Sequence, residues 1–270
     1  MLTYPQIDPV IFSVGPVAIR WYGLMYVLGF IASYLLVQRQ IVKHRQEALA
    51  ARFDNLNLVL ILSVIAGGRL GYVLFYNPGY YFSHPAEIVA TWQGGMSFHG
   101  ACLALLLSGL WFCRHYRLDF WITADFYAAT APIGLGLGRI GNFLNGELYG
   151  RVTDVPWAMV FPDGGPLPRH PSQIYEVLLE GALLFVILWL NREKTWQGRW
   201  PHRGWPHGAI AALFLIGYGL IRIFVENFRQ PDAQLGFLFD FVTMGQLLSG
   251  CMILGGLVIW WRRRRGMAAR

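Results

Sequence analysis

Several ionisable side chains lie within or beside long apolar stretches of this 270-residue chain: Arg69, His99, Arg139, Glu180, Arg222 and Glu226. In a membrane-spanning helix such a residue costs about 2.5–3.5 kcal/mol on insertion scales and usually has a function. Arginine suits a phosphate, because its guanidinium donates two hydrogen bonds and stays charged. Imidazole exchanges a proton near neutral pH. These residue types therefore indicate anion binding and proton transfer.

Arg222 and Glu226 are four residues apart, and Tyr218 precedes Arg222 by the same interval. A helix places all three side chains on one face. One interpretation is an ion pair that only stabilises the helix. The other is an arginine that its glutamate holds in position for an anion.

His99 also has two interpretations. Gly94, Gly95 and Gly100 flank it, and they indicate close approach by a ligand or by another helix. A buried histidine that binds a backbone carbonyl is the structural alternative to a proton carrier. Tyr22, beside the expected outer interface, is either an aromatic anchor or a site residue.

Arg69 and Glu180 are opposite in charge and lie in different apolar segments. We expect them to neutralise each other, and a purely structural role is the simpler hypothesis for both.

The stretch GRIGNFLNGELYGR (138–151) brings arginines, asparagines and a glutamate together directly after an apolar run. It overlaps a G-x-G-x-x-G pattern at Gly136, Gly138 and Gly141. That pattern binds dinucleotides only between a strand and a helix of a soluble βαβ unit, and no such unit is expected here. The stretch is instead a candidate wall of an anion site.

The composition indicates that lipid is the solvent of this chain. It is 55% hydrophobic and 14% charged, whereas soluble domains are about a quarter charged. Four charge-free runs approach or exceed the length that spans a bilayer: Trp21–Gln38, Ile88–Cys113, Gly204–Ile221 and Phe241–Trp261. Three further apolar segments carry one or two charges each: Leu56–Tyr76, Phe120–Gly138 and Ser172–Leu190. We predict seven transmembrane helices; the alternative leaves out the charged segments.

The net charge of +7 does not indicate nucleic-acid binding, because the basic residues gather in alternate loops: 39–52, 114–117, 192–203 and 262–265. The positive-inside rule then places the N-terminus in the periplasm and the C-terminus in the cytoplasm. We predict an all-α polytopic protein with one membrane domain (1–270) and a small periplasmic cap (139–171). The cap contains Arg139, Arg151 and Arg169, which the rule does not explain.

The chain shows no ligand set for a metal. Cys102, Cys113 and Cys251 form no C-x-x-C motif and are expected to pack. We expect neither a metal nor another cofactor.

Six motifs carry a resemblance to a known family: RWYGLMY (20–26), GGRLGYVLFYN (67–77), HG (99–100), GRIGNFLNGELYGR (138–151), LPRHPSQIYE (167–176) and YGLIRIFVENFRQPDAQ (218–234). In sequence and order they resemble the bacterial prolipoprotein diacylglyceryl transferases, from about Tyr4 to the last apolar segment. Between Arg151 and Pro168 the chain is shorter than some relatives, which leaves recognition of the substrate peptide open.

The resemblance implies seven spans in the inner membrane, with the active site towards the periplasm. It implies transfer of the diacylglyceryl group of phosphatidylglycerol to the thiol of the lipobox cysteine in a prolipoprotein signal peptide, with release of glycerol phosphate. Arg139 corresponds to the family's phospholipid-binding arginine. The other matching positions are Tyr22, His99, Asn142, Glu147, Gly150, Tyr218, Arg222 and Glu226.

From these positions we expect His99, Arg139 and Arg222 to be catalytic and the others to bind substrate. A thiolate is the nucleophile, and negative charge develops on the departing phosphate, where fixed donors act strongly. We expect Arg139 and Arg222 to hold that charge and Glu226 to align Arg222. His99 is either the base for the thiol or a residue that orients the headgroup.

Three other classes of membrane protein fit the sequence less well than the transferase. A transporter with an anion-binding intramembrane site is the main alternative, although transporters often contain two related halves. A retinal receptor needs a lysine in a late helix, whereas Lys43 and Lys194 lie in predicted loops. A metal-dependent phosphotransferase needs spaced aspartates, and the apolar segments contain no such cluster.

Overall fold

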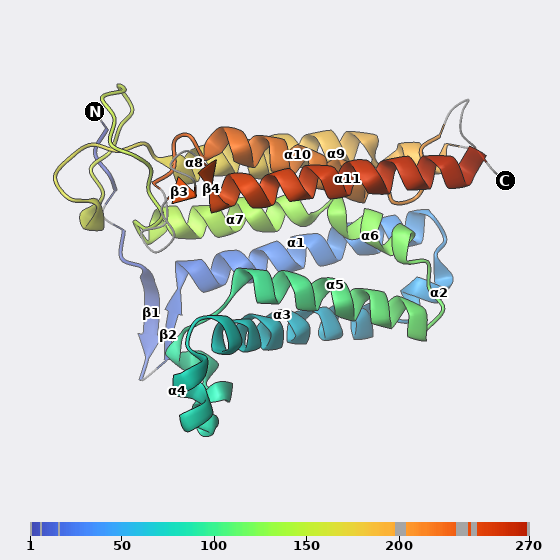
Figure 1. The fold of residues 1–270 in the computed structure, drawn as a ribbon, viewed down its shortest axis with the longest axis horizontal. Coiled ribbons are helices and arrows are strands. Elements are labelled where there is room, and N and C mark those ends of the chain that lie inside the picture. The colour runs from blue at the N-terminus through green and yellow to red at the C-terminus, as the bar shows by residue number, and fades with distance from the viewer. Residues whose placement is uncertain are drawn as a thin grey trace. The chain divides into compact units, whose positions relative to one another are not determined.

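The computed structural model describes residues 2–5, 7–15, 17–197, 204–230, 237–238 and 242–268 (Figure 1). The described chain is mostly helical. Two short antiparallel hairpins pair β1 (Val10–Val14) with β2 (Val17–Arg20) and β3 (Phe237–Leu238) with β4 (Val242–Thr243). The chain forms two compact units, one of Met1–Val37 with Ala124–Arg270 and one of Gln38–Thr123.

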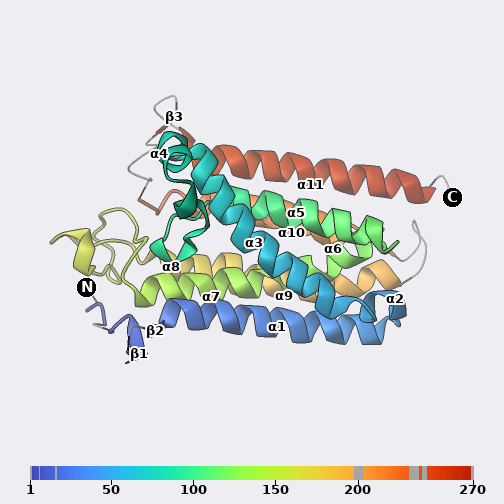
Figure 2. The same ribbon diagram turned by 90° about the horizontal axis from the view of Figure 1, so that it is seen from below.

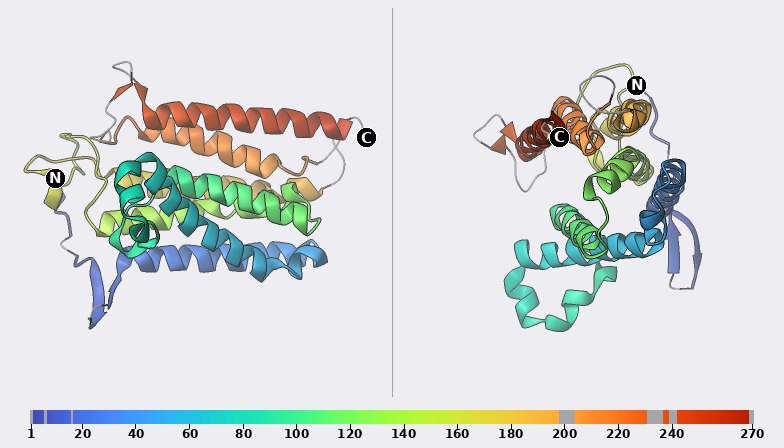
Figure 3. Two further views of the ribbon diagram at one scale, coloured as in Figure 1. Left: turned by 60° about the horizontal axis from the view of Figure 1, so that its bottom comes forward. Right: turned by 90° about the vertical axis from the view of Figure 1, so that its right-hand side faces the viewer.

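The first unit holds most of the long helices. Its elements are α1 (Trp21–Lys43) up to residue 37, the end of α6 (Phe120–Ala128), α7 (Ala131–Leu144), α8 (Ser172–Glu176), η4 (Val177–Leu183), α9 (Leu184–Asn191), η5 (Arg192–Trp196), α10 (Ala209–Val225) and α11 (Met244–Ala268), with η3 (Pro162–Gly164) in the cap. α10 and α11 pack along each other (Figure 3). η4 is a π-helical turn between α8 and α9.

Glycines bring the helices of this unit together. Gly29 of α1 faces Gly134 of α7, where a Cβ added to Gly29 would lie 3.2 Å from the Gly134 Cα. Gly136 meets Gly181 of η4 in the same way, at 3.1 Å. Small residues let helix backbones approach closely in lipid. Gly136, the first glycine of the G-x-G-x-x-G pattern, is thus a helix-packing position.

A carboxylate from α6 caps the start of α10. The Asp125 carboxylate accepts hydrogen bonds from the backbone amides of Gly208 (2.7 Å) and Ala211 (2.9 Å). The first amides of a helix lack partners within the helix, so this side chain satisfies two of them. Asp125, which is a charge inside an expected span, therefore fixes the helix that carries Arg222.

The second unit is built on α3 (Phe53–Phe75) and α5 (Phe98–His115), which pack against each other (Figure 2). Between them lie α4 (Pro78–Ser83), η1 (Pro85–Val89) and η2 (Thr91–Gln93), and α2 (Glu47–Ala50) precedes α3. Gly67 and Gly71 of α3 receive Gly100 of α5: a Cβ on Gly100 would lie 2.3 Å from the Gly67 carbonyl oxygen. Gly67 and Gly71 therefore let α3 and α5 approach closely.

Within the described residues, four helices are long and apolar enough to cross a membrane: Trp21–Lys43, Phe53–Phe75, Ser172–Trp196 and Met244–Gly266. Ala209–Val225 is a shorter apolar helix. The chain is thus a helical membrane protein.

Two expected span boundaries are wrong. The helix expected from Ile88 begins at Phe98, because 3₁₀ turns and the left-handed residues Gly94 and Gly95 precede it. The expected span Phe120–Gly138 is divided into α6 and α7, and Pro132 stands in the first turn of α7.

Candidate functional site

Arg139 lies on α7 and binds a fully buried carboxylate. Its Nε is 2.5 Å from Oε2 of Glu176, on α8. Its Nη1 donates to Oδ1 of Asn142, one turn further along α7, at 3.3 Å. Among the described residues no partner is found for Arg139 Nη2.

Two more arginines reach the same Glu176 oxygen. Nη1 of Arg222, on α10, lies 3.1 Å from Oε2, and Nη1 of Arg229 lies 3.5 Å from it. Three guanidinium groups from three segments thus converge on one carboxylate oxygen. A phosphate oxygen is an anion of the same kind, and guanidinium groups bind both.

Arg222 has two further carboxylate partners. Glu180 Oε1 lies 3.5 Å from its Nη1, and Glu226 Oε2 lies 3.1 Å from its Nη2. The predicted Arg222–Glu226 pair is therefore present. We call the six residues the arginine–glutamate cluster: Arg139, Arg222, Arg229, Glu176, Glu180 and Glu226. With all six ionised, its charges balance.

The arginines of the cluster differ in access. The side chain of Arg139 is 20% exposed, that of Arg222 13% and that of Arg229 8%, while Glu176 and Glu180 are fully buried. Burial, followed by repulsion from Arg222, lowers the pKa of Arg229. Arg139 is therefore the most exposed arginine of the cluster.

Glu176 and Glu180 are four residues apart, so one helix face presents both to Arg222, and a π-helical turn lies at this point. It begins directly after Glu176 and contains Glu180. Gly181, in the same turn, packs against the backbone of Gly136 on α7. π-helical turns within α-helices often lie at functional sites.

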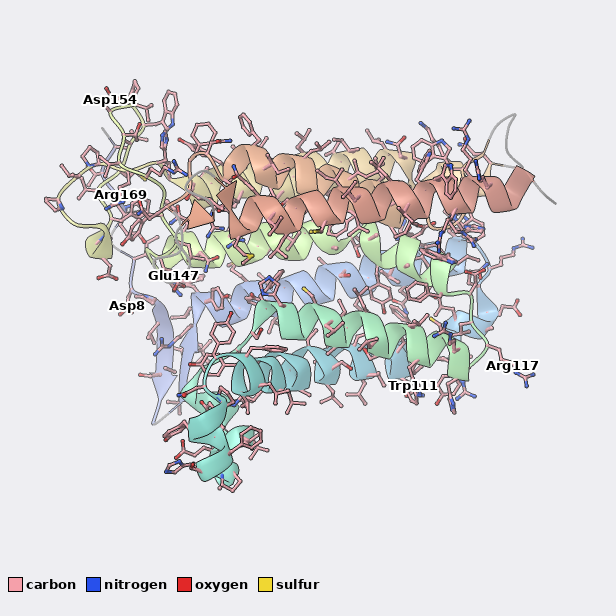
Figure 4. All side chains as sticks on the ribbon, viewed as in Figure 1. Asp8, Trp111, Arg117, Glu147, Asp154 and Arg169 are labelled. Atoms are coloured by element: carbon pink, nitrogen blue, oxygen red, sulfur yellow. The ribbon has the colours of Figure 1, made fainter. Side chains whose placement is uncertain are left out.

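A polar network continues from Arg139 towards the cap. The side-chain amides of Asn142 and Asn145 approach Glu147 Oε1 at 3.4 and 2.9 Å. Gln173 of α8 donates to the Glu147 carbonyl oxygen at 2.7 Å. Figure 4 shows Glu147 beyond the end of α7, on the side of the cap. The structure thus connects Asn142 and Glu147, two predicted site residues, to Arg139.

Tyr22 packs on α7, where a Cβ on Gly141 would lie 2.8 Å from its ring. Its hydroxyl lies 3.0 Å from that of Tyr26, one turn along α1. Tyr218, on α10, is partly buried and packs against the apolar core of this unit. Both tyrosines thus belong to the same unit as the cluster.

Gly150 lies where the cap meets the segment after α10. Its amide donates to the His170 carbonyl oxygen at 2.8 Å, and it forms an isolated bridge with Arg229. A Cβ there would lie 2.4 Å from the Phe228 carbonyl oxygen. Gly150 therefore allows close backbone packing behind Arg229.

Two of the three arginines that the positive-inside rule did not explain hold the cap together, whereas Arg139 lies on α7. Nε of Arg151 donates to the Arg229 carbonyl oxygen at 2.8 Å. Arg169, labelled in Figure 4, donates to the Gly164 carbonyl oxygen at 2.8 Å and lies over the Tyr149 ring. Both bind backbone carbonyls, which accounts for their presence on the expected outer side.

The expected pairing of Arg69 with Glu180 is wrong. Glu180 pairs with Arg222, and Arg69 donates to backbone carbonyls of its own unit. Opposite charge alone did not identify the partner. His99 lies exposed on α5, in the unit of residues 38–123, and its convergence with Arg139 stays a prediction.

Sequence reasoning missed Glu176 and Arg229 as members of the site. Both occur in the quoted motifs, and Glu176 was an unexplained charge in an apolar helix. The available signal for Glu176 was the surplus of arginine over glutamate near the expected outer side, because partly buried arginines need carboxylate partners. Among the described residues, no group of three His, Cys, Asp or Glu side chains is placed to hold a metal ion.

The family model described as prolipoprotein diacylglyceryl transferase matches residues 9–262. A phosphatidylglycerol–prolipoprotein diacylglyceryl transferase of Desulfotalea psychrophila is 64% identical over 261 residues, which cover 96% of this chain and 95% of the relative. Proteins of the same name from Geobacter sulfurreducens and Vibrio vulnificus (strain YJ016) are 51% and 50% identical, covering 96% and 98% of this chain and 96% and 95% of the relatives.

Proposed function

This chain belongs to the prolipoprotein diacylglyceryl transferase family, and we propose that it transfers the diacylglyceryl group of phosphatidylglycerol to the lipobox cysteine of prolipoproteins. The products are a thioether-linked diacylglyceryl protein and glycerol phosphate. The observation that best supports this chemistry is the convergence of three arginines on one buried carboxylate oxygen.

The reaction is a substitution at carbon. The cysteine sulfur attacks the glycerol carbon of the diacylglyceryl group, a C–S bond forms, and the C–O bond to phosphate breaks. The electron pair of that bond leaves with the glycerol phosphate. The thiol proton passes to a base or to the leaving phosphate, so charge and atoms balance.

We assign the developing phosphate charge to Arg139 and Arg222. Arg139 is the more exposed and has Nη2 free of described partners. Arg222 is fixed by three carboxylates and so needs little reorganisation as the charge develops. Glu226 aligns Arg222, and Glu176 sets the spacing between the two arginines.

His99 is proposed as the base for the thiol or as a residue that orients the headgroup. The positive charges of the site also favour the thiolate, since nearby cations lower a thiol pKa. Asn142 and Glu147 face the glycerol headgroup in this proposal. Tyr22 and Tyr218 border the site, and Gly150 supports it.

The proposed setting is the inner membrane, with seven transmembrane helices, a periplasmic N-terminus and a cytoplasmic C-terminus. Alternation of basic loops supports this topology, and the chain is then one membrane domain with residues 139–171 as a periplasmic cap. Single-cysteine variants Asp154→Cys and Lys194→Cys, in a chain without its native cysteines, test it in intact spheroplasts. A membrane-impermeant maleimide should label the first only; labelling of the second only would contradict the orientation.

The activity is tested with purified protein in detergent containing EDTA. Phosphatidylglycerol and a synthetic lipobox peptide with one cysteine are added, and the peptide mass is measured. A gain of one diacylglyceryl group, absent from a Cys→Ser peptide, is the expected result. No gain from well-folded protein across several lipids and peptides would contradict the proposal and favour the transporter alternative. Activity only after addition of Mg²⁺ would favour a metal-dependent enzyme.

A further inference from the structure

Arg69, on α3, binds four backbone carbonyl oxygens and is 3% exposed. Its Nε donates to Ile88 (2.8 Å) and its Nη2 to Glu87 (2.6 Å). Its Nη1 donates to Gly94 (2.5 Å) and Gly95 (3.2 Å). All four acceptors belong to one segment, 87–95, between α3 and α5. One guanidinium thus fixes a connection that contains only short 3₁₀ turns.

Backbone carbonyls and an aromatic ring stabilise this buried charge. Among the residues that the structure describes, no ion pair to Arg69 is found. The nearby carboxylate of Glu87 accepts a hydrogen bond from the Tyr80 hydroxyl instead, at 2.9 Å. The ring of Tyr81 lies 5.0 Å from the guanidinium carbon. All three guanidinium nitrogens of Arg69 thus donate to backbone carbonyls of the segment that they hold, which indicates a structural role and not anion binding.

The clamped segment leads directly into α5. Gly94 and Gly95 have φ angles of +84° and +75°, which residues other than glycine rarely adopt. A Cβ on Gly95 would also lie 2.6 Å from the Tyr72 ring and 3.0 Å from Arg69 Nη1. The turn before α5 therefore depends on these glycines and on Arg69.

The start of α5 is fixed to the same turn of α3. The amide of Ser97 donates to the carbonyl oxygen of Gly68, the neighbour of Arg69, at 2.8 Å. The Ser97 hydroxyl caps α5 by accepting from the Gly100 amide at 3.2 Å. Gly100 in turn packs against Gly67 and Gly71. His99 lies between these two anchored residues.

The His99 side chain has no comparable support. It is exposed, and the centroid of its ring lies 5.8 Å from that of Phe98. Within the described part of the chain no hydrogen bond to the imidazole is found. Its position in this unit is therefore set by its backbone.

We infer that Arg69 is a positioning residue for His99: by clamping residues 87–95 to α3, it fixes the backbone that carries the imidazole. This inference rests on the proposed function, in which His99 contributes to transfer. Lysine cannot replace Arg69, because three donors on one nitrogen cannot reach carbonyls that three separate nitrogens bind.

The test compares Arg69→Lys with Arg52→Lys, a matched change of an exposed arginine at the start of α3. Misplacing a reacting group by 1 Å costs about 10²-fold in rate. We expect Arg69→Lys to lose activity on that scale and Arg52→Lys to keep it. The loss should appear in the same kinetic parameter, kcat or KM for phosphatidylglycerol, as the loss in His99→Asn.

A double-mutant cycle separates positioning from general destabilisation. If Arg69 acts through His99, Arg69→Lys should cause much less further loss in a His99→Asn background. Equal losses in both backgrounds would overturn the inference. If His99→Asn leaves too little activity to measure, hydrogen–deuterium exchange decides: Arg69→Lys should speed exchange in peptides covering 87–100 and leave 106–115 unchanged, and unchanged exchange at 87–100 would overturn it.

The two proposals fail differently. An inactive wild-type protein would contradict the proposed function. An active wild type whose Arg69→Lys variant is equally active would contradict only the role of Arg69.

Discussion

The two units each bury arginine, and they stabilise its charge in opposite ways. In the first unit, Arg139, Arg222 and Arg229 share carboxylates, with Glu176 Oε2 at the centre. In the second unit, Arg69 uses backbone carbonyls alone among its described hydrogen-bond acceptors. Both arrangements offset the cost of a buried charge.

The difference indicates two uses of the same residue. A carboxylate holds a guanidinium in place and leaves Nη2 of Arg139 without a partner among the described residues. In the proposed reaction, an incoming phosphate would find this donor already oriented. A guanidinium whose donors are spent on carbonyls fixes the backbone. The first arrangement suits ligand binding and the second suits positioning.

The largest expected effect comes from neutralising the open arginine. Arg139→Gln removes a donor from the leaving phosphate and leaves Glu176 with one partner fewer. Loss of one such donor costs about 10²–10³ in kcat, and we expect a loss at least that large in the peptide-mass assay. Arg52→Gln is the control, and near-normal activity of Arg139→Gln would break the comparison.

Neutralising the shared carboxylate should have a smaller effect. Glu176→Gln keeps the size of the side chain but leaves three guanidinium groups without their common anion, so their repulsion moves them apart. Since displacement by 1 Å costs about 10²-fold, we expect a rate loss up to that size. Exposed Glu47→Gln serves as the matched change. An unaltered rate in Glu176→Gln would show that the shared carboxylate is dispensable.

Packing beneath Tyr22 should matter less again. Gly141→Ala places a methyl group against the Tyr22 ring, whereas a Cβ on Gly134 of the same helix meets nothing within 4 Å. Overpacking costs about 1–3 kcal/mol, so we expect Gly141→Ala to lower Tm. Gly134→Ala should leave it unchanged or raise it, because alanine favours helix over glycine. Equal Tm values for the two variants would refute the close contact at Tyr22.

The smallest effect concerns the cap. Burial lowers the pKa of His170, whose Nδ1 lies 3.0 Å from the Tyr175 hydroxyl. The unfolded chain therefore takes up a proton on His170 at a higher pH than the folded chain does. The free energy of unfolding falls as the pH drops below the histidine pKa of the unfolded chain, about 6.5. Tm should fall slightly more for wild type than for His170→Asn between about pH 7.5 and pH 5.5; identical falls would exclude His170 as the cause.

Most of the long helices could be predicted from the length of the apolar runs. The orientation inferred from the basic loops stays a prediction. The segments around Trp21, Leu56, Ser172 and Met244 all form long helices. The start of α5 could not be predicted from the apolar run, which begins at Ile88. The positive φ values of Gly94 and Gly95 and the hydrogen bonds of Arg69 keep the chain from forming a helix before Phe98. These hydrogen bonds form between α3 and a segment about twenty residues away.

The site was predicted in its residue types and only partly in its partners. Arg222 and Glu226 are close in sequence, so helical spacing was enough to pair them. Glu176 joins arginines of three other segments, and sequence spacing carries no information about such approaches. The backbone acceptors of Arg69 could not be predicted, because every residue has a carbonyl oxygen and the sequence does not show which ones an arginine binds.

In the proposed reaction the carboxylate-held arginines bind the phosphate and Arg69 does not. The most direct test is the rise in Tm caused by glycerol phosphate, the proposed product, measured for wild type, Arg139→Gln and Arg69→Lys. Because a ligand stabilises the state that binds it, Tm should rise in wild type and Arg69→Lys but not in folded Arg139→Gln. An equal rise in Arg139→Gln, or its loss in Arg69→Lys alone, would contradict the account.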